Sequence, residues 1–124
     1  MNDYSQEALD NAFKVVSSSI VKCEKIHPKF KEGTSQFSLL RNRIKALEIT
    51  KCLIENDESI KGYTREDLEK ALPPVISIRN KTEKARSKYE EGSTQFKRFS
   101  PIIDAMYIGE SLINNEMGKR DGVK

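Results

Sequence analysis

The sequence lacks the residue patterns that most enzymes and membrane proteins carry. Its 124 residues include one histidine, two cysteines and no tryptophan. Nucleotide-binding glycine-rich loops and closely spaced zinc ligands are missing. No apolar run approaches the ~20 residues of a membrane-spanning helix, and no basic segment followed by an apolar one opens the chain, so we expect no signal peptide. These features favour a non-enzymatic cytoplasmic protein without metal or cofactor.

The histidine and the cysteines are expected to be structural. If the chain turns near Gly33, Cys23 and Cys52 lie more than ~10 Å apart along antiparallel helices that rise ~1.5 Å per residue. That separation is too large for a disulfide, and free thiols are typical of a reducing compartment. His27 falls on an apolar helix seam, which is more typical of a packed side chain than of a catalytic base.

Charged residues are abundant but nearly balanced. Lys and Arg number 22 and Asp and Glu number 19, for a net charge of +3. Part of the excess lies in residues 119–124, which we expect to form a flexible basic tail. A dedicated nucleic-acid binder is usually far more basic. Nucleic acid is therefore the weakest partner hypothesis, and it would involve Arg41, Arg43 and Lys45.

The chain contains an internal repeat. Shifted by 59 residues, residues 4–57 align without a gap with residues 63–116, and 20 of the 54 aligned pairs are identical. A repeat of this length is typical of a duplicated supersecondary unit. We predict one all-α domain over residues 1–118, made of repeat one (1–59) and repeat two (60–118).

Each copy has the pattern of a helix, a tight turn and a second helix. Ser5 and Thr64 are suitable N-caps, and Gly33 and Gly92 suit left-handed turns. Apolar residues recur on one face of the first helix at alternating steps of four and three. Short turns and a short link predict an up-down-up-down four-helix bundle built from two antiparallel hairpins. Both glycine turns would then lie at the same end of the bundle.

The two copies differ along the seam of their first helices. The second copy has Arg79, Thr82 and Arg86 where the first has isoleucine, cysteine and histidine. Burial of an unpaired guanidinium costs several kcal/mol. In one interpretation Pro73 and Pro74 change the phase of this helix, so that the arginines face water. In the other, the arginines line an anion-binding cleft near the turns.

The repeated turn is the best candidate for a binding site. A helix N-terminus offers free N–H groups and a partial positive charge, and two such ends would lie side by side. A phosphate-bearing, nucleotide-like ligand fits that chemistry. The residues expected to bind it are Lys29, Thr34, Ser35, Gln36, Arg79, Arg86, Lys88, Ser93, Thr94 and Gln95.

Two alternatives to anion capture stay open. Glycine followed by serine or threonine is also what any tight helix–helix turn requires. The apolar and basic faces of the last two helices also suit a protein–protein adaptor or inhibitor that acts as a homodimer.

The stretch from Lys22 through Leu47 resembles small, poorly characterised tandem-repeat helical proteins of Gram-positive bacteria and their phages. The resemblance implies a bacterial or phage cytoplasmic setting. It implies no catalytic residue and no particular activity. In a phage setting, anion capture would amount to sequestering a signalling molecule.

Overall fold

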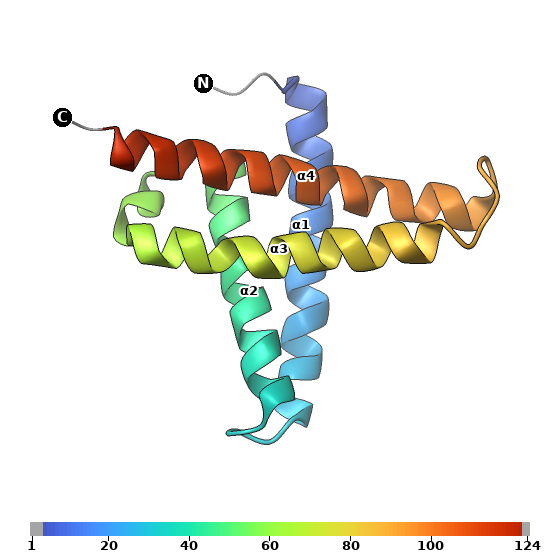
Figure 1. The fold of residues 1–124 in the computed structure, drawn as a ribbon, viewed down its shortest axis with the longest axis horizontal. Helices are drawn as coiled ribbons and strands as arrows, with labels where there is room; N and C mark the ends of the chain where they lie inside the picture. The colour runs from blue at the N-terminus through green and yellow to red at the C-terminus, as the bar shows by residue number, and fades with distance from the viewer. Residues whose placement is uncertain (1–3, 123–124) are drawn as a thin grey trace.

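The chain is all-helical, as its sequence pattern predicts. A computed structural model describes residues 4–122, so residues 1–3 and the last two positions of the expected tail lie outside the described residues. No strand occurs in residues 4–122 (Figure 1). The elements in chain order are α1 (Gln6–Ile26), the 3₁₀ helix η1 (His27–Lys29), α2 (Ser35–Ile54), the 3₁₀ helix η2 (Glu58–Gly62), α3 (Arg65–Arg86) and α4 (Thr94–Asp121).

Side-chain caps set where the four helices begin. The hydroxyls of Ser5, Thr34, Thr64 and Ser93 each accept a hydrogen bond from a backbone N–H of the following turn. At Thr64 the bond is reciprocated by Asp67, which completes a capping box. The starts of α1 and α3, and those of α2 and α4, are 59 residues apart. The caps therefore fall at equivalent positions of the two repeats.

The turns use the two glycines in the expected way. Gly33 has φ 92° and Gly92 has φ 90°, a region that favours glycine. The helix before the first turn ends earlier than Gly33, at Ile26. Pro28 follows in η1, and proline has no N–H with which to continue an α-helical ladder. Each turn joins two antiparallel helices, so α1–α2 forms a first hairpin and α3–α4 forms a second.

The two hairpins cross one another, which differs from the bundle expected from sequence. In Figure 1 the first hairpin runs vertically and the second runs horizontally in front of it. The Gly33 turn lies at the lower end of the first hairpin, and the Gly92 turn lies at the right end of the second. The expectation that both turns share one end of an up-down-up-down bundle is therefore corrected.

The distribution of buried residues explains why the hairpins cross. No residue in 21–39 or in 76–102 is buried. The buried residues lie in the parts of the helices near the crossing. Packing the hairpins lengthwise would place Arg79 and Arg86 in an apolar interior, which is costly for a guanidinium. A crossed arrangement buries the apolar halves and leaves the charged halves as two projecting arms.

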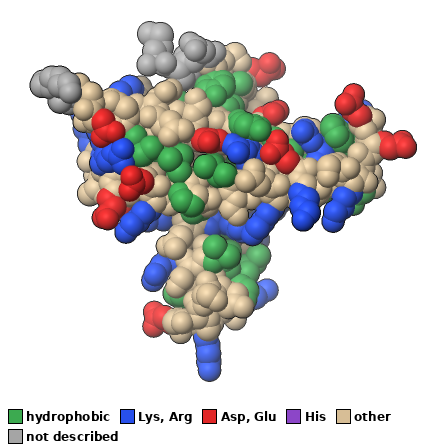
Figure 2. Space-filling model, in the orientation of Figure 1, with side chains coloured by type: hydrophobic (Ala, Val, Ile, Leu, Met, Phe, Trp, Pro, Cys, Tyr) green, Lys and Arg blue, Asp and Glu red, His purple; other side chains and the backbone are tan. Residues whose placement is uncertain are grey.

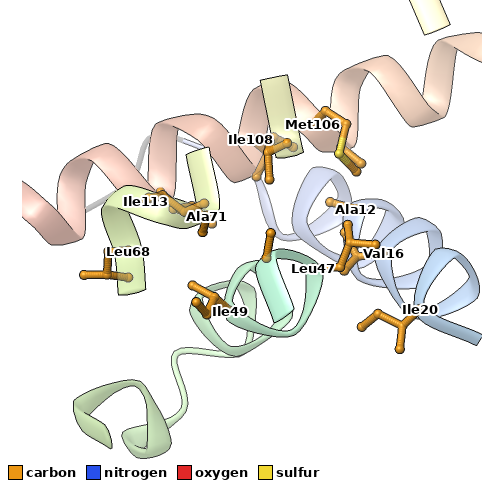
Figure 3. Packing of buried hydrophobic residues seen from close by; sticks show 14 residues of the cluster. Ala12, Val16, Ile20, Leu47, Ile49, Leu68, Ala71, Met106, Ile108 and Ile113 are labelled. Atoms are coloured by element: carbon orange, nitrogen blue, oxygen red, sulfur yellow. The ribbon is translucent and has the colours of Figure 1, made fainter. Parts of the chain in front are cut away.

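The core lies where the two hairpins cross (Figure 3). Val16 and Leu47 of the first hairpin and Met106 and Ile113 of the second are fully buried there. The remaining members of this cluster are Ala12, Ile20, Ala46, Ile49, Leu68, Ala71, Val75, Ala105, Ile108 and Leu112. Four of the 14 are alanines, and their small side chains let the helices approach closely.

α2 and α4 approach each other closely at Thr50 and Gly109, which occupy equivalent positions of the two repeats. Thr50 is fully buried, and its hydroxyl donates a hydrogen bond of 2.9 Å to the Ala46 carbonyl. A Cβ atom added at Gly109 would lie 2.9 Å from Thr50 Cγ2. Real Cβ atoms do not approach that closely, so this crossing requires glycine at position 109.

The C-terminal part of α4 packs against the rest of the fold. Residues 119–121, expected to begin a flexible tail, belong to α4. Arg120 Nη2 donates to the Ile60 carbonyl at 2.8 Å, and Arg65 forms an ion pair with Asp121 at 2.9 Å. None of the described helices is long and apolar enough to span a membrane.

We expect G109A to destabilise the fold. The added methyl group forces Thr50 or α4 to shift, which costs about 1–3 kcal/mol, and the gain in helix propensity offsets at most about 1 kcal/mol of this. Urea denaturation measures the difference. The control is G118A in the same helix, where a Cβ meets nothing within 4 Å. Equal stability of G109A and G118A would contradict the close crossing, whereas T50A should relieve G109A in the double variant.

Candidate functional site

The residues expected to bind an anion are divided between two distant places. Thr34, Ser35 and Gln36 lie at the end of the first hairpin, and Ser93, Thr94 and Gln95 lie at the end of the second (Figure 1). The structure therefore does not bring the two helix N-termini together. Any anion site at the turns would consist of one turn alone.

Within each turn, one hydroxyl is already engaged. Thr34 and Ser93 accept N-cap hydrogen bonds at 3.2 Å from the N–H groups of Phe37 and Phe96. The remaining predicted turn residues are exposed: Lys29, Ser35, Gln36, Lys88, Thr94 and Gln95.

Arg79 and Arg86 both contact side chains of α4. Arg79 neither faces water nor lines a free anion site, because its side chain is 16% exposed and contacts the Glu110 carboxylate. Its Nε also lies 3.8 Å from Glu83 Oε1. Arg86 Nη1 donates to Ser100 Oγ at 3.1 Å, and its guanidinium lies 4.7 Å from the centre of the Phe96 ring. Both arginines bridge α3 and α4.

Six side chains of α3 and α4 form one bridged face on the second hairpin. The Arg79 guanidinium lies 4.5 Å from the centre of the Tyr107 ring, and the Tyr107 hydroxyl donates to Glu83 at 3.1 Å. The Arg79–Tyr107 ring contact, the Tyr107–Glu83 hydrogen bond and the contacts of both arginines described above link α3 to α4. The bridged face consists of Arg79, Glu83, Arg86, Ser100, Tyr107 and Glu110.

The six equivalent positions of the first hairpin form an open groove instead. They carry different side chains except for one retained glutamate, and none of them forms an ion pair with another described residue. Two hollows of about 490 and 510 Å³ occupy this face of α1 and α2. The six groove positions are Ile20, Glu24, His27, Arg41, Glu48 and Lys51.

The two hollows are continuous because they share Glu24, Glu48 and Tyr63. Glu48 and Thr50 are two residues apart and project from opposite sides of α2, so the groove faces away from the crossing with α4. Apolar wall residues include Ile20, and Val21, which is 49% exposed. Burial, and then the Glu48 carboxylate, raise the pKa of Tyr63. The groove thus has an apolar wall and, where the two hollows meet, the carboxylates of Glu24 and Glu48.

Two polar atoms of the groove wall have no internal partner. Ser17 Oγ and His27 Nε2 are buried and form no hydrogen bond with a described residue. The His27 ring packs on Phe37, with centroids 4.1 Å apart. Buried polar groups are normally hydrogen-bonded. Both atoms therefore lack the partner that buried polar groups normally have.

The sequence comparison drew attention to positions 20 and 27 of the first copy but did not identify this groove. It noted that Ile20 and His27 are replaced by arginines in the second copy, and it looked for the site among those arginines. The usable signal was the set of accompanying changes on the second helices, where Glu48 and Lys51 become Tyr107 and Glu110. Those changes supply partners for Arg79 and therefore indicate a filled face rather than an open one.

No protein-family model, curated protein or solved structure significantly matches the chain. In residues 4–122 no group of three or more His, Cys, Asp and Glu side chains is arranged to hold a metal ion. Both cysteines are free thiols. The groove must therefore be interpreted from its own geometry and from its comparison with the bridged face.

We expect E110A to destabilise the protein by about 1–2 kcal/mol, because it leaves the mostly buried Arg79 guanidinium without its closest carboxylate. Thermal and urea unfolding measure the change. The matched control is K51A, at the equivalent position of the first hairpin. The Lys51 ammonium lies over the Phe13 ring at 5.4 Å and forms no ion pair with a described residue, so we expect its loss to cost about 0.5 kcal/mol. Equal costs would contradict a special role for the bridged face.

Proposed function

We propose that this chain is a non-enzymatic binding protein that docks a helical segment of a protein partner in the groove of the first hairpin. The observation that carries the proposal is the contrast between equivalent faces. Six positions are linked by side chains in the second hairpin, whereas in the first they line two continuous hollows.

The shape and composition of the groove suit a helix. Its walls are two antiparallel helices, along which Ser17 to His27 spans roughly 15 Å and Arg41 to Glu55 roughly 21 Å at 1.5 Å per residue. Three to four turns of a third helix would fill that length. A groove with an apolar wall and a charged rim is a common receptor for an amphipathic helix.

The internal repeat accounts for the presence of two equivalent faces in one chain. We propose that the two hairpins derive from one duplicated hairpin, since their caps and turns occupy equivalent positions. The second hairpin then fills its own outer face with Arg79 and Tyr107 and acts as a scaffold. The first hairpin keeps the corresponding face open for a partner.

The groove can be closed with the side chains of the second hairpin. The variant I20R/E48Y/K51E introduces the equivalents of Arg79, Tyr107 and Glu110 beside the retained Glu24. In a selection from a random library of about 16-residue peptides, long enough for four helical turns, we expect peptides that bind the wild type at least about tenfold more tightly than this variant. Fluorescence anisotropy of individual peptides measures the ratio.

Two controls keep this test decisive. V21N changes an exposed wall residue to its counterpart, Asn80, and should weaken the same peptides even if the triple variant does not fold. K14A changes an exposed α1 lysine outside the two hollows and should have no effect. If every selected peptide binds wild type, V21N and K14A equally, the groove is not the docking site.

A second candidate function, capture of an anionic ligand, is favoured by the charge of the arms. Residues 20–45 carry seven basic and two acidic side chains, and residues 79–104 carry seven and four. Figure 2 shows Lys and Arg side chains along the distal part of the second hairpin and at the lower end of the first. Such a ligand would contact one arm end at a time. Binding of nucleic acid and homodimer formation through the last two helices stay predictions.

A thermal-shift series with nucleotides and inorganic phosphate tests this second candidate. A phosphate-bearing ligand held at one turn should raise the melting temperature as its concentration increases, because binding stabilises the folded state. The variant Q36A/K29A should remove the response if the first turn is the site, and Q95A/K88A if the second is. A flat melting temperature across the whole panel would rule out anion capture at both turns.

A further inference from the structure

We infer that the partner segment presents an arginine side chain, and that its guanidinium occupies the hollow beside Glu24 and Glu48. The inference rests on the proposed docking function and specifies the chemistry of its partner. It follows from the equivalence of the two hairpins, one of which carries an arginine of its own at this place.

The second hairpin shows how such a site holds a guanidinium. Arg79 extends from α3 and contacts the Glu110 carboxylate on α4. Glu83 lies 3.8 Å from its Nε, and the Tyr107 ring covers the guanidinium at 4.5 Å. The planar cation therefore has carboxylates at its edge and an aromatic ring on its face, an arrangement that suits arginine better than lysine.

The first hairpin keeps part of this arrangement but has no arginine. Glu24 is the counterpart of Glu83, and Glu48 places a second carboxylate where Tyr107 stands. Ile20 stands at the position equivalent to Arg79, so the hairpin's own first helix places no guanidinium in the space. Neither Glu24 nor Glu48 forms an ion pair with another described residue.

The surrounding charge favours a cation in this hollow. Four carboxylates line it, those of Glu24, Glu48, Glu55 and Asp57, against the single cation of Lys51. The Lys51 ammonium lies over the Phe13 ring at 5.4 Å and does not pair with the four acids. A hollow with excess negative charge and an apolar rim attracts a cation that brings its own apolar stem.

The end of the groove near His27 is less negatively charged than the end near Asp57. Arg41 and Lys45 line the second hollow together with the two shared glutamates, and Lys45 is already paired with Asp67 at 2.9 Å. A docked helix would therefore meet net negative charge towards Asp57 and a more balanced charge towards His27. This gradient along the groove gives the arginine a defined place, near the end that lies towards the link between the hairpins.

The composition of groove-dependent peptides tests this inference. Among peptides from the random library that lose affinity for I20R/E48Y/K51E and V21N, we expect arginine to be enriched at one position. E24Q/E48Q keeps the shape of the groove and removes the two carboxylates, and it should weaken these peptides by about tenfold or more. The charge-matched control E90Q/E91Q, at the exposed end of the second hairpin, should leave their affinity unchanged.

A minimal probe gives an independent readout. N-acetyl-arginine methylamide should shift the backbone amide NMR signals of Glu24, Glu48 and Tyr63 in the wild-type chain, and E24Q/E48Q should abolish these shifts. The norleucine analogue lacks the charge and should produce none. R79A opens the equivalent site of the second hairpin and should add a response at Glu83 and Glu110, which calibrates the sensitivity of the measurement.

The possible outcomes separate this inference from the proposed function. Groove-dependent peptides that lack arginine, carry lysine instead or bind E24Q/E48Q normally would overturn the arginine inference and leave helix docking intact. A library without any groove-dependent peptide would overturn both. A response to the arginine probe in R79A alone would also overturn the inference, since the method would then detect such a site only in the second hairpin.

Discussion

The close approach of α2 and α4 at Thr50 and Gly109 is the constraint on which the rest of the structure depends. The two residues are equivalents in the repeat, so the two hairpins meet at the same point of their second helices. One side supplies a stiff, fully buried threonine, and the other supplies the space that only glycine leaves. With backbones this close, the neighbouring alanines and branched apolar side chains interdigitate around the contact. The core is therefore compact and local.

The core is confined to the crossing, so the distal parts of the hairpins, the arms, lie outside it. Because burial ends at Ile20 and Leu40 in the first hairpin and at Val75 and Ile103 in the second, each arm is a pair of helices without a buried residue. The second hairpin compensates with the Arg79 bridge, in which the cost of holding a guanidinium away from water is offset by two carboxylates and an aromatic ring. Among the described residues, the equivalent positions Ile20, Glu48 and Lys51 of the first hairpin form no such bridge.

Local features of the fold were predictable from sequence, and the arrangement of the hairpins was not. Caps at Ser5 and Thr64 and the glycine turns depend on interactions within a few residues, which the sequence shows directly. The relative orientation of the hairpins depends on which turns of each seam are apolar. Arg79 and Arg86 signalled that the seam is interrupted, but helical periodicity alone cannot distinguish a rotated helix from a bridged one. The expectation that the turns share one end failed for this reason.

The groove was hidden from single-position reasoning for a related physical reason. An arginine that replaces an isoleucine in a repeat looks like the gain of a site, because charge is rare in a core. Whether it is a gain depends on its partners, and these lie some 30 residues away on the next helix, at Tyr107 and Glu110. Considered together with Tyr107 and Glu110, Arg79 indicates a face that is filled by its own side chains and not a newly gained binding site. The copy with Arg79 satisfies its own face, whereas the copy with Ile20 has carboxylates that form no ion pair with a described residue and that lie beside an open apolar wall. On our proposal, the hairpin with fewer internal bonds at these equivalent positions is the one that uses them to bind a partner.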